Sequence, residues 1–192
     1  MDAGKLFRES PVFEMDRLIL RRLAIADSED YFAFASSPVV TAQTTWDIHR
    51  SLDDTVNYLN KVLRRYEEQT EYHWGIVLKE TNRLIGRTGL ISIDPVHDKA
   101  ELGYVISDAW WNRGITTEAT LPVLRYAFAE LGANRIEARC NKDKVGSYRV
   151  MEKLGLKFEG ILRKQLKIKG SYTDQRMYAM LRDEYFLKYG RS

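Results

Sequence analysis

The chain has 192 residues, of which 44% are hydrophobic and 30% charged, proportions that favour a single globular domain spanning residues 1–192. A net charge of +3 is too small to indicate nucleic-acid binding, no apolar run approaches the roughly 18 residues of a membrane span, and the first residues lack the apolar core of a secretory signal. The single cysteine, Cys140, cannot form an internal disulfide and the three histidines lack ligand spacing, so we expect a cytoplasmic protein without a metal site.

Alternating and helical hydrophobic patterns divide the first half of the chain into strands and helices. The predicted elements are a strand at 17–23, a helix from Asp27 or Ser28 to about Ser36, a loop at 38–50, a helix from Ser51 or Asp53 to about Glu68, and strands at 72–79 and 84–93. Ser and Asp are common helix caps, and Pro38 is expected to interrupt the first helix.

The second half continues with strands and helices in alternation. The predicted elements are a strand at 100–106, a helix at 114–131, a strand at 135–140, a helix at 147–154 ended by Gly155, and strands at 158–168 and 172–181 joined at Lys169 and Gly170. Pro122 lies inside the first of these helices and predicts a kink. This order predicts an α/β (α+β) fold with a mixed, mainly antiparallel sheet of six or seven strands and helices on both faces.

The loop before the helix at 114–131 has the features of an anion site. It reads Trp111-Asn112-Arg113-Gly114-Ile115-Thr116. The first backbone N–H groups of a helix have no partner within the helix, and the helix dipole adds partial positive charge there. Gly114 lets a bulky anion approach the main chain, so we expect a phosphate group to bind here. Neither a P-loop nor a GxGxxG dinucleotide motif is present.

The segment ELGYVISDAWWNRGITTEA, residues 101–119, resembles the pyrophosphate loop of the GNAT acyltransferases, which wraps the diphosphate of coenzyme A. It is most similar to the Rim-type branch, the ribosomal-protein N-acetyltransferases and their relatives. The matching positions are Trp110, Trp111, Arg113, Gly114, Thr117, Glu118 and Ala119. Asn112 and Thr116 depart from the pattern, and Thr116 adds bulk where the family has Gly or Ala.

A second segment, RIEARCNKDKVGSYRVMEKLGLKFEG at residues 135–160, resembles the second signature of the same family. That signature has a strand ending in Asn, a Ser about six residues later, and a helix closing in EKLGF before a strand with Glu-Gly. The matching positions are Asn141, Ser147, Glu152, Lys153, Leu154, Gly155, Phe158, Glu159 and Gly160. A weaker match at residues 170–181 resembles the last hairpin of the family, so the resemblance covers nearly the whole chain.

The resemblance implies a GNAT fold in which the strands bearing Tyr104 and Cys140 run parallel and splay apart, with acetyl-CoA bound in the gap. The implied coenzyme contacts are Tyr104, Val105 and Ile106 for the pantetheine arm, Arg113, Gly114, Ile115, Thr116 and Thr117 for the diphosphate, and Asn141 and Ser147 near the acetyl group.

Acetyl transfer from a thioester to an amine needs a neutral amine and a proton for the departing thiolate. Glu101 is the candidate base, because the family often has a carboxylate near this position and an apolar wall would raise its pKa. Glu101 could instead pair with a neighbouring Arg or Lys. Ser147, favoured by the Rim-type signature, and Tyr148 are the candidate acids; otherwise Ser147 stabilises a helix N-terminus and Tyr148 is a packing residue.

The acceptor amine is less determined by the sequence. In the family it enters between the first two helices and the last hairpin, where this chain carries Trp46, Asp47, Asp53, Asp54, Tyr58, Glu67, Glu68, Glu71, Tyr172 and Asp174. An acidic rim would attract a cationic peptide N-terminus or a polyamine. Four functions stay open: acetylation of a protein's α-amine, acetylation of a small amine such as a polyamine, amino acid or antibiotic, a silent acyl-CoA-binding module, and a structural domain. Exposed aromatic residues in the last hairpin could form the contact of a homodimer.

Overall fold

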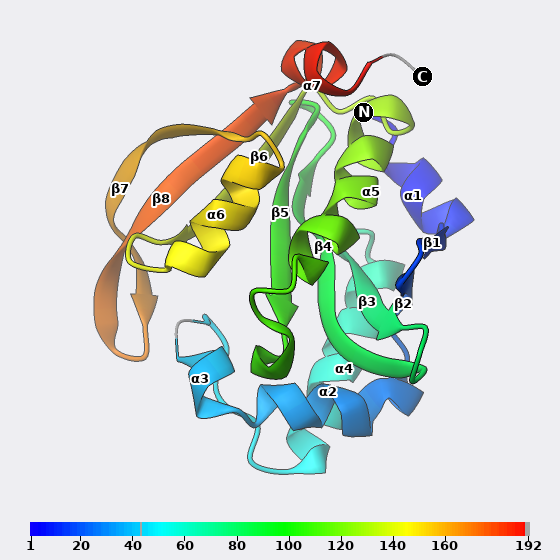
Figure 1. The fold of residues 1–192 in the computed structure, drawn as a ribbon, viewed down its shortest axis with the longest axis vertical. Coiled ribbons are helices and arrows are strands. Elements are labelled where there is room, and N and C mark those ends of the chain that lie inside the picture. The colour runs from blue at the N-terminus through cyan, green and yellow to red at the C-terminus, as the bar shows by residue number, and fades with distance from the viewer. Residues whose placement is uncertain (43, 191–192) are drawn as a thin grey trace.

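The computed structural model describes residues 1–42 and 44–190, with an eight-stranded sheet at the centre (Figure 1). The strand order is β1-β2-β3-β4-β5-β6-β8-β7. The bounds are β1 Phe13–Glu14, β2 Leu18–Arg22, β3 Tyr72–Leu78, β4 Arg83–Asp94, β5 Lys99–Ile106, β6 Arg135–Asn141, β7 Lys157–Ile168 and β8 Ser171–Leu181. All neighbours are antiparallel except β5 and β6, which confirms the predicted mixed sheet. The strand beyond the six or seven predicted is the two-residue β1.

Helices precede, connect and follow the strands. Their bounds are α1 Ala3–Glu9, α2 Ser28–Ala35, α3 Pro38–Thr41, α4 Leu52–Glu67, α5 Ile115–Ala129, α6 Val145–Lys153 and α7 Arg182–Tyr189, with 3-10 turns at Ile25–Asp27 and Asp108–Trp110. The loop predicted at 38–50 is wrong at its start, because Pro38 begins α3 and Ser37 caps that helix. Helix α5 continues through Pro122. Within the described residues, no helix combines the length and apolar character needed to cross a membrane.

Two neighbouring residues of β4 show that helices cover opposite faces of the sheet. Arg87 Nε donates to the Tyr31 hydroxyl of α2 at 3.0 Å, whereas Thr88 Oγ1 bonds to Thr120 Oγ1 of α5 at 3.1 Å. Successive side chains on a strand point to opposite faces, so α2 and α5 lie on opposite sides. Helix α4 packs with α2, and α6 packs with α5, which confirms the predicted helices on both faces.

The parallel strands β5 and β6 are paired over a short distance only. Their register runs from Lys99 opposite Arg135 to Leu102 opposite Ala138. Beyond that point β5 stays paired with β4 and β6 stays paired with β8. The backbone groups that face the resulting gap are therefore available to another molecule. This divergence confirms the splayed parallel pair that the sequence resemblance implies.

The β7–β8 hairpin extends away from the rest of the sheet, and its tip lies beside α3 (Figure 1). The turn is made by Lys169 and Gly170, whose φ angles are 48° and 86°. Positive φ at both central residues is typical of the tight turns that match the twist of antiparallel strands. Lys169 Nζ donates to the carbonyl oxygen of Thr41 at 2.6 Å. The hairpin tip and α3 are therefore in direct contact.

A buried polar network links β3 and β4 to the end of α4. Arg87 Nη1 lies 2.9 Å from His73 Nδ1, and His73 Nε2 lies 3.0 Å from the Glu71 carboxylate. Arg65 also donates to Glu71, at 2.9 Å. Burial, with the neighbouring Arg87 charge, lowers the pKa of His73 to about 4. The neutral ring therefore accepts from Arg87 and donates to Glu71 at physiological pH.

We expect the free energy of unfolding to fall as the pH is lowered from 6.5 to 4. Unfolded His73 takes up a proton near its ordinary pKa of 6.5, whereas the folded chain resists protonation down to about 4. Since the unfolded state binds more protons in this window, the loss is about 3 kcal/mol. Urea unfolding at a series of pH values measures it. His73→Gln should flatten the dependence, while His97→Gln, which changes an exposed histidine, should not; parallel curves for all three proteins would contradict the assignment.

Candidate active site

The loop between β5 and α5 places free backbone N–H groups at one point. Asn112 and Gly114 both have positive φ, 59° and 76°, and Gly114 is the residue that precedes the helix. The first helical hydrogen bond runs from the Glu118 N–H to the Gly114 carbonyl at 3.0 Å. The amides of residues 115–117 therefore lie in the first turn, where the helix offers them no acceptor. A Cβ at Gly114 would meet no atom within 4 Å, so the main chain at the start of the helix is open on this side.

Three side chains fix the position of this loop. The Arg113 guanidinium lies 4.8 Å from the centre of the Trp110 ring. The Trp111 indole N–H donates to the Ile106 carbonyl at 3.0 Å, which ties the loop to the end of β5. Ile115 is buried, whereas Thr116 and Thr117 are half-buried. The predicted diphosphate residues Arg113, Gly114, Ile115, Thr116 and Thr117 are thus brought together at the N-terminus of α5.

Tyr104 and Ser147 meet where β5 and β6 diverge. The Tyr104 hydroxyl donates to the Ser147 carbonyl at 2.8 Å and lies 3.1 Å from the Ser147 hydroxyl. Burial raises the pKa of Tyr104 and that of the neighbouring Cys140 thiol. Both groups therefore stay protonated at physiological pH. Ser147 is the third residue of α6, which begins at Val145 rather than at Ser147 as predicted.

The other predicted residues near the second signature make different contacts. The Asn141 side-chain oxygen accepts from the Asp143 N–H at 3.2 Å, as in a turn at the end of a strand. The Arg176 guanidinium lies over the Tyr148 ring, 4.6 Å from the ring centre. Val105 and Ile106 continue β5 beyond the last residue that pairs with β6. Of the two candidate acids, Ser147 is the one whose hydroxyl lies within hydrogen-bond distance of Tyr104 at the gap.

Glu101 forms a bidentate ion pair with Arg139 across the parallel strands. Its carboxylate accepts from Arg139 Nε and Nη2, both at 2.8 Å, and only 8% of the residue is exposed. Burial raises the pKa of Glu101, and the Arg139 charge opposes that rise. The pairing with a neighbouring Arg, which the sequence left open, is therefore present. It orients both oxygens of the carboxylate and leaves a catalytic role as a proposal.

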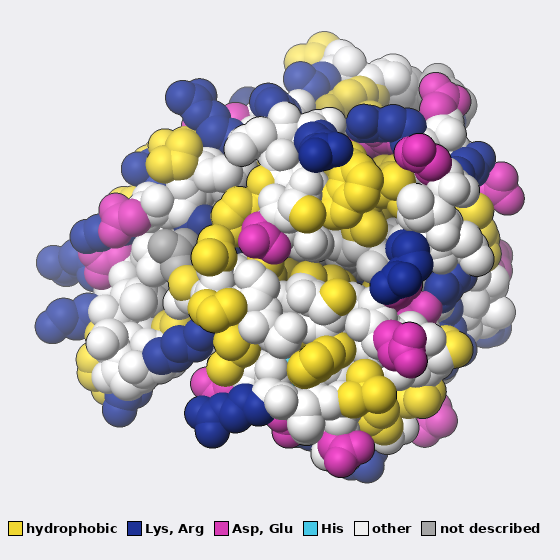
Figure 2. Space-filling view, turned by 60° about the horizontal axis from the view of Figure 1, so that its bottom comes forward, with side chains coloured by type: hydrophobic (Ala, Val, Ile, Leu, Met, Phe, Trp, Pro, Cys, Tyr) yellow, Lys and Arg dark blue, Asp and Glu magenta, His cyan; other side chains and the backbone are white. Residues whose placement is uncertain are grey.

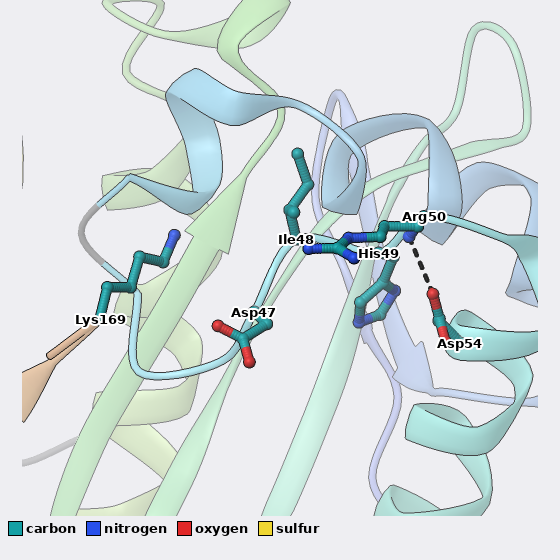
Figure 3. A pocket seen from close by; sticks show the side chains of 6 residues that line it. All are labelled: Asp47, Ile48, His49, Arg50, Asp54 and Lys169. Atoms are coloured by element: carbon teal, nitrogen blue, oxygen red, sulfur yellow. Dashed lines mark hydrogen bonds between the residues drawn. The ribbon is translucent and has the colours of Figure 1, made fainter.

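A cavity of about 710 Å³ lies between the segment after α3, the start of α4 and the hairpin tip. It is lined by Asp47, Ile48, His49, Arg50, Asp54 and Lys169. Figure 3 shows Lys169 at the end of the hairpin, with Asp47 between it and the group formed by His49, Arg50 and Asp54 in this view. His49 is buried behind this surface, and burial lowers its pKa. The cavity thus offers a polar opening with charges of both signs.

Several acidic residues expected to form a rim are engaged within the protein. Asp54 accepts from the N–H groups of Arg50 and Ser51 at 2.9 and 3.2 Å, as a helix cap. Glu71 lies in the His73 network described above, and Asp174 accepts from Lys142 Nζ at 3.2 Å. Asp47 forms no ion pair with any residue that the structure describes. An acidic rim around the opening is therefore reduced to a few exposed carboxylates.

Three features of the site were not predicted from the sequence. They are Arg139, the Tyr104 hydroxyl and the contact between Lys169 and Thr41. One signal was available for Arg139: in RIEARCN, polar residues alternate with Ile136, Ala138 and Cys140, which places Arg139 on one face with the other charges of β6. Within the described part of the chain, no group of three or more His, Cys, Asp or Glu side chains is arranged to hold a metal ion.

Known proteins share both the sequence pattern and the fold. Residues 17–157 match a family described as the acetyltransferase (GNAT) domain. An uncharacterised N-acetyltransferase of Bacillus subtilis, YoaA, is 32% identical over 172 residues, which cover 90% of this chain and 97% of that protein. The crystal structure of a GNAT-family acetyltransferase from Bacillus anthracis superposes with a TM-score of 0.80 at 27% identity, covering 91% of this chain and all of that chain.

A more distant structure shares the fold alone. It is RimL, described as a ribosomal L7/L12 alpha-N-protein acetyltransferase, solved in complex with coenzyme A. It superposes with a TM-score of 0.79 at 18% identity, and the match covers 91% of this chain and 99% of that one.

Proposed function

The chain belongs to the GNAT family of acetyltransferases, and from this we propose that it transfers the acetyl group of acetyl-CoA to the N-terminal α-amine of a polypeptide. The observation that carries this proposal is the position of Ser147. It lies in a segment that resembles the Rim-type signature, and it is hydrogen-bonded to Tyr104 where β5 and β6 separate.

The residues around the gap fit the parts of acetyl-CoA. We propose that the amides of residues 115–117 hold the diphosphate, next to the open main chain at Gly114. Arg113, the residue before Gly114, would add positive charge. The unpaired backbone of β5 at Tyr104, Val105 and Ile106 would bond to the amides of the pantetheine arm, and Asn141 would orient its end. When bound, acetyl-CoA supplies the thioester from which the acetyl group is transferred.

Two side chains would move the protons of the reaction. The Glu101 carboxylate takes a proton from the acceptor ammonium, directly or through a water, so that the amine can attack. As the C–S bond breaks, the Ser147 hydroxyl donates its proton to the departing thiolate and regains a proton from water. Tyr104, whose pKa is raised by burial, holds the Ser147 side chain in place. Tyr148 keeps a packing role beneath Arg176.

Acetyl-CoA at 100 times its Kd should stabilise the fold by about 2.7 kcal/mol, seen as a rise in the melting temperature. Gly114→Ala should weaken binding by about tenfold or more, because the added methyl would occupy open space next to the main chain where the diphosphate is proposed to lie. Gly132→Ala is the matched control, since Gly132 also has positive φ, 71°, and follows the same helix at its other end. Both substitutions cost backbone strain of about 1 kcal/mol. Equal coenzyme-induced shifts in the two variants would place the diphosphate elsewhere.

A small amine is the second candidate acceptor. The position of Asp47 favours this acceptor: its carboxylate lines the cavity and has no ion-pair partner among the described residues. Asp47 could therefore pair with the second ammonium group of a polyamine. Mass spectrometry of reactions with acetyl-CoA and three acceptors separates the candidates: a peptide with a free N-terminus, the same peptide with a blocked N-terminus and one Lys, and spermidine. Acetylation of spermidine alone would reject the polypeptide acceptor, and the absence of any product would reject both.

A further inference from the structure

The hairpin beside the acceptor cavity carries an excess of positive charge. Residues 161–176 contain five basic side chains and one acidic one, a net charge of +4. The basic residues are Arg163, Lys164, Lys167, Lys169 and Arg176, and the acidic one is Asp174. Because the whole chain has a net charge of +3, all its other residues together sum to −1. Figure 2 shows Lys and Arg side chains gathered at the left edge of the molecule, where the β7–β8 hairpin lies.

These charges are not neutralised within the protein. Among the residues described, none of the five basic side chains forms an ion pair with a carboxylate. Asp174 is occupied by Lys142, and Lys169 donates to a backbone carbonyl. Elsewhere the basic side chains commonly pair with acids, as Arg135 does with Glu159 and Arg139 with Glu101. Arg176 packs on the Tyr148 ring and donates to the Lys142 carbonyl, whereas the exposed Arg163, Lys164 and Lys167 have no carboxylate partner among the described residues. The hairpin, which we call the basic hairpin (residues 161–176), therefore presents exposed positive charge to an external partner.

An irregular segment of β7 holds two of these cations in the solvent. Leu162 pairs with Gln175 and Leu166 with Thr173, so residues 163–165 lie opposite Asp174 alone. Lys164 has a φ of 51°, and its N–H donates to the Asp174 carboxylate at 2.9 Å. Non-glycine residues adopt this backbone conformation at a cost, and such bulges often reorient side chains next to functional sites. Arg163 and Lys164 are consequently held exposed.

The bulge lies close to the gap where the acetyl group is proposed to sit. Gln175, adjacent to the bulge, pairs with Asn141 at the end of β6, and the Lys142 N–H donates to the Asp174 carbonyl at 3.0 Å. The opposite end of the basic hairpin, Lys169, lines the acceptor cavity. Lys164 in the bulge and Lys169 at the tip are five residues apart along the strand, a distance of about 17 Å. A bound extended peptide would cover this distance with about five residues.

We propose that the basic hairpin binds an acidic stretch of the polypeptide acceptor, located within about the first ten residues after the acetylated N-terminus. This inference rests on the polypeptide acceptor proposed above, and narrows it to acceptors with an acidic N-terminal segment. Charge complementarity selects this occupant: unpaired cations next to the cavity attract carboxylates and disfavour a basic segment. The diphosphate site at α5 lies on the opposite face of the sheet from the helices that border the cavity, so it does not require these cations.

The test uses three synthetic peptides that start with the same Ser-Ala and continue with four Glu, four Gln or four Lys. Fluorescence anisotropy of peptides labelled at their C-terminus gives Kd without turnover, and acetylation assays give KM for each. The wild-type chain should bind the Glu peptide about tenfold tighter than the Gln peptide at low salt, with the preference falling as salt is added. The Lys peptide should bind most weakly.

Two double variants with equal changes in net charge identify the surface. Arg163→Glu with Lys164→Glu should abolish the preference for the Glu peptide and leave the KM for acetyl-CoA unchanged. Lys61→Glu with Lys153→Glu, which changes exposed lysines on α4 and α6, should keep the preference. Equal affinity of the wild-type chain for all three peptides would overturn the inference. So would an equal loss in both double variants, or a raised KM for acetyl-CoA in the hairpin variant.

The same measurements separate this inference from the function on which it rests. If the wild-type chain acetylates all three peptides with one KM, the polypeptide acceptor stands and the role of the basic hairpin is wrong. If the Glu peptide binds selectively but none of the peptides is acetylated, the proposed function is wrong and the charge preference stands. An oligoribonucleotide with the same net charge as the Glu peptide serves as a competitor, and its tighter binding would reject a polypeptide as the occupant.

Discussion

Ser147→Ala should lower kcat by about a hundredfold while the stabilisation by acetyl-CoA is unchanged. Proton donation by a positioned side chain typically contributes between about a hundredfold and ten-thousandfold. The Ser147 hydroxyl is the protonated group held by Tyr104 at the divergence of β5 and β6, so its loss leaves the departing thiolate without this donor. Release of free thiol from acetyl-CoA, followed at saturating acceptor, measures kcat. Thermal unfolding with and without acetyl-CoA measures binding.

Three further variants make this result specific. Tyr104→Phe removes the hydroxyl that positions Ser147 and should lower kcat by about tenfold with the KM for acetyl-CoA unchanged. Ser92→Ala, the control, changes an exposed serine near the C-terminal end of β4 and should have no effect. Tyr148→Phe should also be neutral, because the ring lies under Arg176 and keeps that contact. Normal turnover by Ser147→Ala together with slow turnover by Tyr148→Phe would transfer the acid role to Tyr148.

Arg139→Leu should lower the free energy of unfolding by about 3 kcal/mol. The substitution leaves the Glu101 carboxylate, whose side chain is 10% exposed, without either of its two hydrogen-bond donors. An unpaired buried charge is more costly than a neutral polar pair, so Glu101→Gln combined with Arg139→Gln should recover at least half of the loss. Chemical denaturation of the two variants and the parent protein measures these differences.

The pH dependence of the same variant tests the role of Glu101 as a base. Burial raises the Glu101 pKa, and the Arg139 charge opposes that rise, so Arg139→Leu should raise it further. A base acts in its deprotonated form, and its activity is lost as the pH falls through its pKa. The acidic limb of kcat/KM should therefore move to higher pH in Arg139→Leu. An unshifted limb, with the protein folded at that pH, would show that Glu101 only stabilises the fold.

The elements predicted correctly are those that generate their own signal in the sequence. Helix α4 has a Ser51 cap and an apolar stripe, and the hairpin turn has Lys169 and Gly170. The missed elements depend on contacts that are distant in sequence. Helix α1 is joined to the rest by the Asp2 N–H and the Leu131 carbonyl at 2.8 Å, and α7 by the Arg182 N–H and the Asn134 carbonyl at 2.9 Å. Short segments of this kind carry little periodicity of their own.

A similar division applies to the candidate site. The anion site proposed at Gly114 would consist of backbone amides, so a glycine before a helix is enough to propose it from the sequence. The pair of Glu101 and Arg139 depends on the register of two parallel strands, in which Glu101 lies opposite Glu137, one pair before Ala138. Sequence patterns assign residues to faces but do not give that register. The charge of the basic hairpin was readable in the sequence, whereas the absence of internal partners required the arrangement of side chains.

The short parallel ladder between β5 and β6 also determines how the two parts of the sheet hold together. In the strand order, β1 to β5 meet β6 to β8 at this one junction, and only residues 99–102 and 135–138 form it. A rotation of one part against the other would widen or narrow the gap, and would also change the contacts of Tyr104 with Ser147 and of Lys169 with Thr41. A ligand that spans the gap would contact both parts of the sheet and restrict their relative motion. The protein should therefore be more rigid with the ligand bound than after its release.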